Sequence, residues 1–385
     1  KPNLGHLVTN DIKKLGKLFQ SYNEEIRIVG GAVRDALLGK NPKDIDLATT
    51  ATPDKMLSIA KEENIRVIET GLQHGTVTFV INGEPYEITT LRVDSETDGR
   101  HAKVDWTKSF KEDARRRDLT YNAMSVDING NLYDYFNGLN DLRKNKTSFV
   151  GNVDERIQED YLRILRYFRF LAKHPNQKPD PNIMESIKKN VDGLKNISGE
   201  RIWMELSKMV TYPNMHSSLK GICESGISEI LFFECNQNAI EESKRIKQES
   251  DNPITILSPM FNNTIEFTKF ASKLKIPNDF KNLGIFLQQE RKNPKESYAK
   301  EIVINNLNPQ YVIELSKVVK NEKLYKDIQK AMNRPEFPIN GNDLIEKGIQ
   351  PGPELGKVLN QLKKEWINSD YKLNKSQLLN KLINN

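Results

Sequence analysis

The amino-acid sequence predicts an α+β fold in which a first part with a small mixed sheet and helices is followed by an entirely helical remainder. Two observations carry this prediction. Residues 1–148 mix short β-branched or aromatic runs with helical patterns. From Val153 onward, apolar residues recur at spacings of three and four, and no convincing strand follows to the end of the chain.

The elements of the first part follow from residue type and periodicity. Strands are expected at Arg27–Val29, His74–Ile81, Pro85–Arg92, Ser125–Ile128 and Leu132–Tyr135. Helices are expected at Asp11–Tyr22, Ala32–Leu38 and Pro53–Glu62. Between them, the stretch Arg92–Lys111 is polar, contains Gly99 and follows a strand, so we expect a long mobile loop there. Loops of this length in compact domains are usually functional or disordered, and motifs that carry chemistry flank this one on both sides.

Composition restricts the class of protein. With 385 residues the chain exceeds a typical single core, and 37% hydrophobic residues exclude a disordered chain. No apolar run approaches the roughly 20 residues that span a bilayer, so we expect no membrane association. The net charge of +6 permits a nucleic-acid partner without requiring one. Cys223 and Cys235 lack a CxxC pattern and a nearby histidine, and we expect free thiols rather than zinc ligands.

Two glycines follow the predicted strand that ends at Val29. Gly30 and Gly31 allow the backbone to approach a phosphate closely, and the short helix that follows offers free N–H groups and carries Arg34. A phosphate-binding turn is therefore expected, although an ordinary turn explains two glycines in isolation.

Paired carboxylates come next, in the sequence Asp44-Ile45-Asp46. On a strand this spacing directs both side chains to one face, and hard oxygen ligands suit Mg²⁺. Glu87 joins that face if its strand pairs with the one that carries Asp46. Three acids in this arrangement can hold two metal ions, one at an RNA 3′-hydroxyl and one at a triphosphate. The alternative is a solvated loop and a surface acid.

A run of arginines precedes Asp118. Arg116 and Arg117 suit triphosphate oxygens, and a carboxylate such as Asp118 accepts a hydrogen bond from a ribose 2′-hydroxyl. Asn122 lies four residues later, and we expect it on the same helical face. A salt-bridged helix with no ligand remains the alternative.

Asp160 and Arg163 are expected to project from one face of a helix, with Arg166 and Arg169 continuing the spacing. Cytosine and adenine each present an amino group beside an acceptor ring nitrogen. In this arrangement Asp160 can accept from the amino group while Arg163 donates to the nitrogen, whereas uracil and guanine present a carbonyl that opposes the carboxylate. An exposed pair of Glu159 with Arg163 is the alternative. Arg166 and Arg169 could contact the triphosphate or the RNA, or simply face solvent, and the sequence does not separate these alternatives.

These motifs, in this order, resemble those of the class II tRNA nucleotidyltransferases of the nucleotidyltransferase superfamily, and the whole set is similar to their eukaryotic branch. The matching segments are GGAVRDALLGKNPKDIDLATT, EITTLR, RRRDLTYNAM, DYFNGLNDL, EDYLRILR and SGERIWMEL. The resemblance implies metal-binding acids at Asp44 and Asp46 with a third acid at Glu87. It also implies ribose and triphosphate contacts at the RRRD motif, and a protein template at Asp160 and Arg163 in place of a nucleic-acid one.

The resemblance also implies four parts: a catalytic nucleotidyltransferase head (1–148), a helical neck for nucleotide selection (149–206), a helical body (207–290) and a helical tail that binds tRNA (291–385). The loop at Arg92–Lys111 is expected to allow the switch from C to A addition. DYFNGLNDL is expected to couple head and neck, through Asp134, Gly138 and Asp141. Glu200 and Arg201 of SGERIWMEL are interpreted as structural.

The function expected from the resemblance is template-independent addition or repair of the 3′-terminal CCA of tRNA from CTP and ATP, with Mg²⁺ as cofactor. The partners are tRNA and the two nucleotides, and the compartment is the mitochondrion and/or the cytoplasm and nucleus. Poly(A) polymerase of the same superfamily is the nearest alternative, followed by an enzyme that adds only CC or only A. A noncatalytic RNA-binding protein is the alternative from another class.

Overall fold

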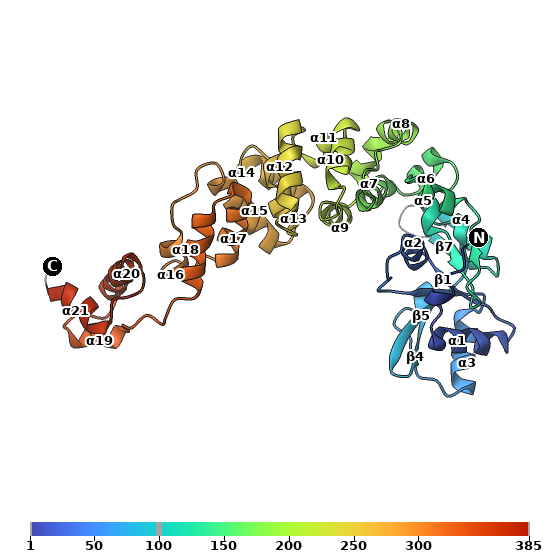
Figure 1. Cartoon of the computed structure of the whole chain (residues 1–385), viewed down its shortest axis with the longest axis horizontal. Coiled ribbons are helices and arrows are strands. Elements are labelled where there is room, and N and C mark those ends of the chain that lie inside the picture. The colour runs from blue at the N-terminus through green and yellow to red at the C-terminus, as the bar shows by residue number, and fades with distance from the viewer. Residues whose placement is uncertain (1, 98–101, 384–385) are drawn as a thin grey trace. The chain divides into compact units, whose positions relative to one another are not determined.

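The computed structural model describes residues 2–97 and 102–383, and it divides into two compact units, residues 1–230 and 231–385 (Figure 1). Unit 1 contains all the strands of the described chain and the helices up to residue 230, and unit 2 is helical. The α+β fold with a helical remainder is therefore confirmed. None of the described helices has the length and apolar character that crossing a bilayer requires.

A seven-stranded sheet forms the centre of the first part of unit 1, with the strand order β3-β4-β5-β2-β1-β8-β9. Its strands are β1 (Ile26–Val29), β2 (Asp46–Thr49), β3 (Val67–Ile68), β4 (Thr76–Ile81), β5 (Glu84–Thr90), β8 (Ser125–Val126) and β9 (Leu132–Tyr133). Neighbours are antiparallel except β2 and β5, which run parallel, so the sheet is mixed as predicted.

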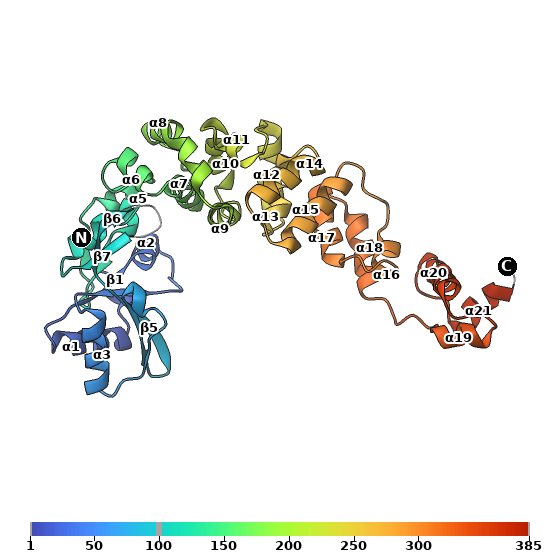
Figure 2. The same cartoon turned by 180° about the vertical axis from the view of Figure 1, so that it is seen from behind.

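Helices α1 (Asn10–Gln20) and α3 (Pro53–Glu62) pack on the sheet and lie on the same side of it in both views (Figures 1 and 2). Each begins at a threonine, Thr9 or Thr52, whose hydroxyl accepts a backbone N–H of the first turn. In this core Phe19 of α1 meets Phe79 of β4 edge to face, with ring centroids 5.5 Å apart. The first turns and this aromatic contact fix the sheet that carries the glycine and carboxylate motifs.

The stretch Arg92–Lys111 is not a loop, and that expectation is wrong. β6 (Arg92–Thr97) and β7 (Ala102–Trp106) form an antiparallel hairpin with a register irregularity between Asp94 and Glu96, and α4 (Phe110–Arg115) begins directly afterwards. Gly99 lies outside the described residues. The pairing is between strands from the same polar stretch, so no apolar alternation announces it in the sequence.

The remaining helices of unit 1 are α2 (Gly31–Leu37), α5 (Gly138–Arg143), α6 (Val153–Glu159), α7 (Arg163–Lys173), α8 (Pro181–Asn190), α9 (Gly199–Met209), α10 (Met215–Glu224) and the start of α11 (Ile227–Leu231). Both α9 and α10 pack against α7, which is the centre of the helical part. The contact between α7 and α10 is close because Gly221 faces Phe168, where a Cβ would lie 2.4 Å from the ring. The expected continuous helix through Asp160 is wrong, since α6 ends at Glu159 and α7 begins at Arg163.

Unit 2 consists of α12 (Gln237–Lys247), α13 (Pro253–Leu257), α14 (Thr264–Lys273), α15 (Asn278–Glu290), α16 (Ala299–Val303), α17 (Pro309–Val319), α18 (Glu322–Met332), α19 (Gly341–Glu346), α20 (Pro353–Asn368) and α21 (Lys375–Ile383). Phe233, Phe261, Phe267 and Phe270 form one aromatic cluster. A second cluster surrounds Trp366. The described chain contains no free cysteine, so the expectation of free thiols is wrong.

Candidate active site

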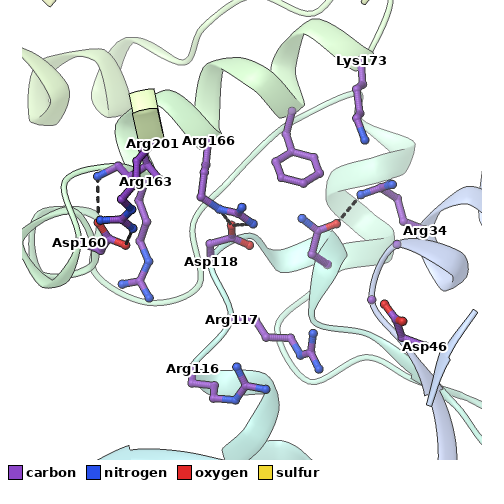
Figure 3. A pocket seen from close by; sticks show the side chains of 15 residues that line it. Arg34, Asp46, Arg116, Arg117, Asp118, Asp160, Arg163, Arg166, Lys173 and Arg201 are labelled. Atoms are coloured by element: carbon purple, nitrogen blue, oxygen red, sulfur yellow. Dashed lines mark hydrogen bonds and ion pairs between the residues drawn. The ribbon is translucent and has the colours of Figure 1, made fainter. Parts of the chain in front are cut away.

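A cavity of about 520 Å³ lies in unit 1 and is lined by residues from both the sheet and the helices (Figure 3). Seven of its side chains are cationic and three are carboxylates, which suits a ligand with several negative charges. The lining residues are Gly30, Gly31, Arg34, Asp46, Arg116, Arg117, Asp118, Asn122, Asp160, Leu162, Arg163, Arg166, Phe170, Lys173 and Arg201. The structure thus brings together most of the residues that the sequence motifs indicated.

The glycine turn forms part of the cavity wall where β1 ends. Gly30 has a φ of 75°, a conformation that favours glycine, and its nitrogen lies 3.4 Å from the carbonyl oxygen of Met124. A Cβ on Gly31 would lie 3.2 Å from the guanidinium of Arg34, so a side chain there would crowd that arginine. Asp46 is paired directly with Val29 at the start of β2, and the wall therefore combines the backbone of the glycine turn with one carboxylate.

The three predicted metal-site acids do not form a single cluster. Asp44 lies just before β2, whereas Asp46 begins that strand, and both are exposed. The expectation that the D-x-D segment lies on one strand is therefore wrong for Asp44. Glu87 lies on β5, which pairs parallel with β2, and the pair Leu47 with Ile88 places Glu87 one step away beside Asp46. Within residues 2–97 and 102–383 no group of three or more acids, histidines or cysteines is placed to hold a metal ion.

A buried carboxylate arranges the arginine run. Asp113 of α4 is 3% exposed and pairs with Arg116 at 3.1 Å and with Arg117 at 3.4 Å. The guanidinium group of Arg117 approaches Gly30, because a Cβ on that glycine would lie 3.8 Å from its Nη1 atom. Arg117 is thus held beside the glycine turn, and Arg116 is held on the same carboxylate, before any ligand binds.

Arg156 fixes the same segment from the other side. Its Nη2 donates to the backbone carbonyl oxygens of Arg116 and Arg117, at 2.6 and 2.5 Å, and its Nη1 pairs with Glu159 at 2.7 Å. Sequence reasoning missed Arg156, since its partners lie some 40 positions earlier in the chain.

Asp118 and Asn122 do not share a helical face, because α4 ends at Arg115 and Asn122 lies in a short 3₁₀ turn, Thr120–Asn122. Both line the cavity nevertheless. Asp118 accepts from Arg166 at 2.6 Å, and the amide oxygen of Asn122 accepts from Arg34 at 2.6 Å. Burial acts to raise the pKa of Asp118, but the ion pair with Arg166 and the N–H of Leu119 outweigh it, so the pKa lies below its ordinary value.

The motif DYFNGLNDL packs against this turn. A Cβ on Gly138 would lie 2.5 Å from the carbonyl oxygen of Thr120, and the Thr120 hydroxyl donates to Asp141 at 2.5 Å. Asp134 accepts the backbone N–H groups of Gly138 and Leu139, which caps α5. The motif therefore positions the segment that carries Asp118 and Asn122. Its coupling of head and neck stays a prediction.

Asp160 and Arg163 lie at one end of the cavity, each with a partner (Figure 3). One oxygen of Asp160 accepts the N–H of Leu162, and the other pairs with Arg201 at 2.9 Å. Arg163 pairs with Glu159 at 2.6 Å, and its side chain is 16% exposed. The Glu159–Arg163 pair of the alternative interpretation thus exists, but it is half-buried and borders the cavity rather than lying on an exposed helix.

Arg169 does not line the cavity. It pairs with the buried Glu205 of α9, and the same carboxylate lies 3.6 Å from Arg166. Arg169 therefore belongs to the support of Arg166.

Four lining residues were not predicted as site residues: Leu162, Phe170, Lys173 and Arg201. Two of them, Phe170 and Lys173, continue a pattern on α7. The intervals from Arg163 to Arg166, to Phe170 and to Lys173 are three, four and three residues, which places these side chains on one side of the helix. Arg201, interpreted from the sequence as structural, lines the cavity as well as bracing Asp160.

Comparisons with known proteins identify the family of the chain. A family model described as the Poly A polymerase head domain matches residues 26–147, and one described as a probable RNA and SrmB-binding site of polymerase A matches residues 178–237. The mitochondrial CCA tRNA nucleotidyltransferase 1 of Mus musculus is 41% identical over 397 residues, covering 98% of this chain and 91% of that protein.

Two solved structures share the fold. The Bacillus stearothermophilus CCA-adding enzyme in complex with CTP has a TM-score of 0.77 at 23% identity, covering 97% of this chain and 96% of that one. The Thermotoga maritima CCA-adding enzyme complexed with tRNA-CCA has a TM-score of 0.73 at 20% identity, covering 100% and 98%. Because the chain is 41% identical to the mouse relative over 98% of its length, it belongs to the family of CCA tRNA nucleotidyltransferases.

Proposed function

We propose that this enzyme completes or repairs the 3′-terminal CCA of tRNA from CTP and ATP, with protein side chains in place of a template. The observation that carries the proposal is a single cavity that holds Asp160 and Arg163 at one end and the glycine turn with Asp46 at the other (Figure 3). In the reaction, the 3′-hydroxyl oxygen of the RNA bonds to the α-phosphorus of the nucleotide and loses its proton. The bond from the α-phosphorus to the bridging oxygen breaks, and pyrophosphate leaves.

Base selection is assigned to Asp160 and Arg163. The carboxylate of Asp160 accepts from the amino group of cytosine or adenine, and Arg163 donates to the adjacent ring nitrogen. The contact of Asp160 with Arg201 supports this role, because an arginine that pairs with a carboxylate fixes the direction of that side chain. Uracil and guanine carry a carbonyl oxygen in place of this amino group, so the carboxylate of Asp160 would face another acceptor and lack a hydrogen-bond donor.

Ribose and triphosphate recognition is assigned to the middle of the cavity. Asp118, ionised beside Arg166, accepts from a ribose 2′-hydroxyl, with Asn122 next to it. Arg116 and Arg117, together with the backbone of the glycine turn, bind triphosphate oxygens.

Enzymes of the nucleotidyltransferase superfamily generally use divalent metal ions, and we propose Mg²⁺ here. The donor set fits this ion, because Asp46 presents an exposed carboxylate to the cavity and Glu87 lies beside it on the neighbouring strand. Asp44 and Asp46 would hold the ion. When bound, it lowers the pKa of the RNA 3′-hydroxyl and neutralises charge on the triphosphate and the leaving pyrophosphate.

The division into head (1–148), neck (149–206), body (207–290) and tail (291–385) is part of the proposal, with tRNA bound mainly by body and tail. A mitochondrial location is supported by the name of the mouse relative. Activity in the cytoplasm and nucleus is a further expectation from the sequence.

Poly(A) polymerase shares the head and is the nearest alternative. The mouse relative that spans the chain is named for CCA addition, which favours that activity. The test is to sequence the 3′ ends made from a tRNA that lacks CCA, with CTP and ATP supplied. We expect products that end in CCA and stop. Unlimited adenosine addition would indicate a poly(A) polymerase, and products that end in CC or lack C would indicate a partial enzyme.

A further inference from the structure

Helix α7 presents four side chains to the cavity along one face: Arg163, Arg166, Phe170 and Lys173. Arg163 is paired with Glu159 and Arg166 with Asp118, so both arginines have a carboxylate partner. Lys173, the last residue of the helix, differs from these two arginines in its partners. In the described part of the chain its ammonium forms no ion pair, and it lies 5.0 Å from the ring of Phe170 and 5.0 Å from that of Tyr212.

The surroundings of Lys173 are mostly positive. Arg34 and Asp35 of α2, Lys40 just beyond that helix and Arg169 of α7 all act on its charge, and three of these four are cations. Burial, followed by the charge of Arg34, lowers the pKa of Lys173 to about 8. A half-buried ammonium among three cations and a single carboxylate, with which no ion pair forms in the described residues, is a place where an anion would relieve repulsion.

The position of Lys173 in the cavity indicates which kind of anion it would contact. In Figure 3 its amine points toward Arg34, on the side of the cavity that Asp46 also occupies and away from Asp160 and Arg163. Base recognition is assigned to the opposite end. Arg34, which acts on the charge of Lys173, and the glycine turn, which lies against Arg34, both suit phosphate oxygens.

We infer that Lys173 is a further substrate-binding residue, which contacts a phosphate group at the glycine-turn end of the cavity. The inference rests on the proposed function, because it assumes a nucleotide with its base at Asp160. This phosphate group has two possible sources: the triphosphate of CTP or ATP, and a backbone phosphate near the 3′ end of the RNA.

Lys173→Met keeps most of the length of the unbranched side chain, and with it most of the packing on Phe170 and Tyr212, but removes the charge. Lys208→Met, which changes an exposed lysine of α9, is the matched control. Two affinities are measured for each variant: CTP with no RNA present, and tRNA lacking CCA with no nucleotide present. We expect one of the two to weaken about tenfold in Lys173→Met only, and Lys173→Arg to restore most of it.

Weaker CTP binding with unchanged tRNA binding identifies the triphosphate as the source, and the reverse identifies an RNA phosphate. Both affinities within twofold of the unmutated enzyme overturn the inference. An unmutated enzyme that fails to add CCA refutes the proposed function instead, so the two failures are distinguishable.

A second measurement needs no variant and covers the case in which Lys173→Met does not fold. Acetylation of Lys173 in the unmutated protein is followed by mass spectrometry with cytidine, with inorganic tripolyphosphate and with tRNA lacking CCA. We expect tripolyphosphate or the tRNA to protect Lys173 and cytidine to leave it reactive. Equal reactivity under all conditions, while Lys208 also stays unchanged, would overturn the inference.

Discussion

The two walls of the cavity differ in how their side chains are held. On the helical wall, the charged lining residues other than Lys173 are paired: Arg163 with Glu159, Asp160 with Arg201, and Arg166 with both Asp118 and Glu205. On the sheet wall, Asp46 is exposed at the start of β2 next to a glycine turn, and Asp44, which precedes that strand and is not a lining residue, is exposed as well. The helical wall is thus oriented before substrate binds, whereas Asp46 of the sheet wall keeps an exposed carboxylate, which is available for the proposed metal ion.

This difference teaches that selectivity and chemistry place opposite demands on charge. Discrimination between bases needs fixed donors and acceptors, because a group that can turn accepts either edge. Metal binding needs carboxylates that are not already neutralised by arginine. The first three of the following changes each weaken one part of the cavity, and the fourth changes a buried residue outside the lining.

The largest effect is expected on the sheet wall. Asp46→Asn or Asp44→Asn should lower the rate of nucleotide addition by ~10³-fold or more, because metal stabilisation of the transition state amounts to several kcal/mol. Affinity for tRNA should change by less than a few-fold. Rates in Mg²⁺ are compared with those of Asp54→Asn, an exposed aspartate of α3. Near-normal turnover in a folded Asp46 variant would remove this acid from the mechanism.

The second largest effect is expected at Asp160 and Arg163, the residues of the helical wall to which recognition of the nucleobase is assigned. Asp160→Ala should reduce the preference for CTP and ATP over UTP and GTP, and Arg163→Ala should lower incorporation of CTP and ATP by about 2–4 kcal/mol in transition-state binding. The measurement is kcat/KM for all four nucleotides on tRNA lacking CCA, with Glu155→Ala as the control. Unchanged ratios among the nucleotides in the Asp160 variant would refute the assignment of a protein template.

A smaller effect is expected at Arg156, which donates to the carbonyl oxygens of Arg116 and Arg117. Arg156→Met should raise KM for CTP about tenfold, since the triphosphate-binding arginines lose their support, and should change the choice among nucleotides little. Arg115→Met removes an exposed arginine from the same run and serves as the control, because its side chain is 57% exposed. A loss of base discrimination as large as that in Asp160→Ala would show that the two functions are not separate.

The smallest effect on activity concerns acid pH. His174, at the end of α7, is 6% exposed, and burial, followed by the charge of Arg34, lowers its pKa to about 4. Between this value and the ordinary 6.5 the unfolded chain binds more protons than the folded one, so the free energy of unfolding should fall as pH falls through this window. The loss at pH 4 is about 3 kcal/mol at most.

Urea unfolding between pH 7 and 4 measures this loss, with His174→Leu expected to remove part of the pH dependence and His6→Leu, an exposed histidine, expected to keep it. At pH 7.5 the rate of nucleotide addition should stay within about threefold, because His174 does not line the cavity. Hydrogen exchange should show earlier opening in α7 than in β1 on acidification. An identical pH dependence in both variants would exclude His174 as the cause.

By itself, the sequence determined the α+β fold and most of the cavity. Short-range patterns carried that information: two glycines after a strand, the run of arginines before Asp118, and the three- and four-residue spacing that continues through α7. Such patterns depend on neighbours in the chain, which periodicity makes visible. The same reasoning failed where a local alternative prevailed, as at Asp160, whose carboxylate accepts the N–H of Leu162 and interrupts the expected helix.

Only the tertiary structure decided which charges meet. Asp160 finds Arg201 41 positions later, Asp118 finds Arg166 48 positions later, and Asn122 lies 88 positions after Arg34. No periodicity links residues at such separations, because their approach depends on how α7 and α9 pack and on where the turn after α4 lies. The hairpin β6–β7 in the expected loop has the same explanation, since pairing between polar strands leaves no apolar alternation to read.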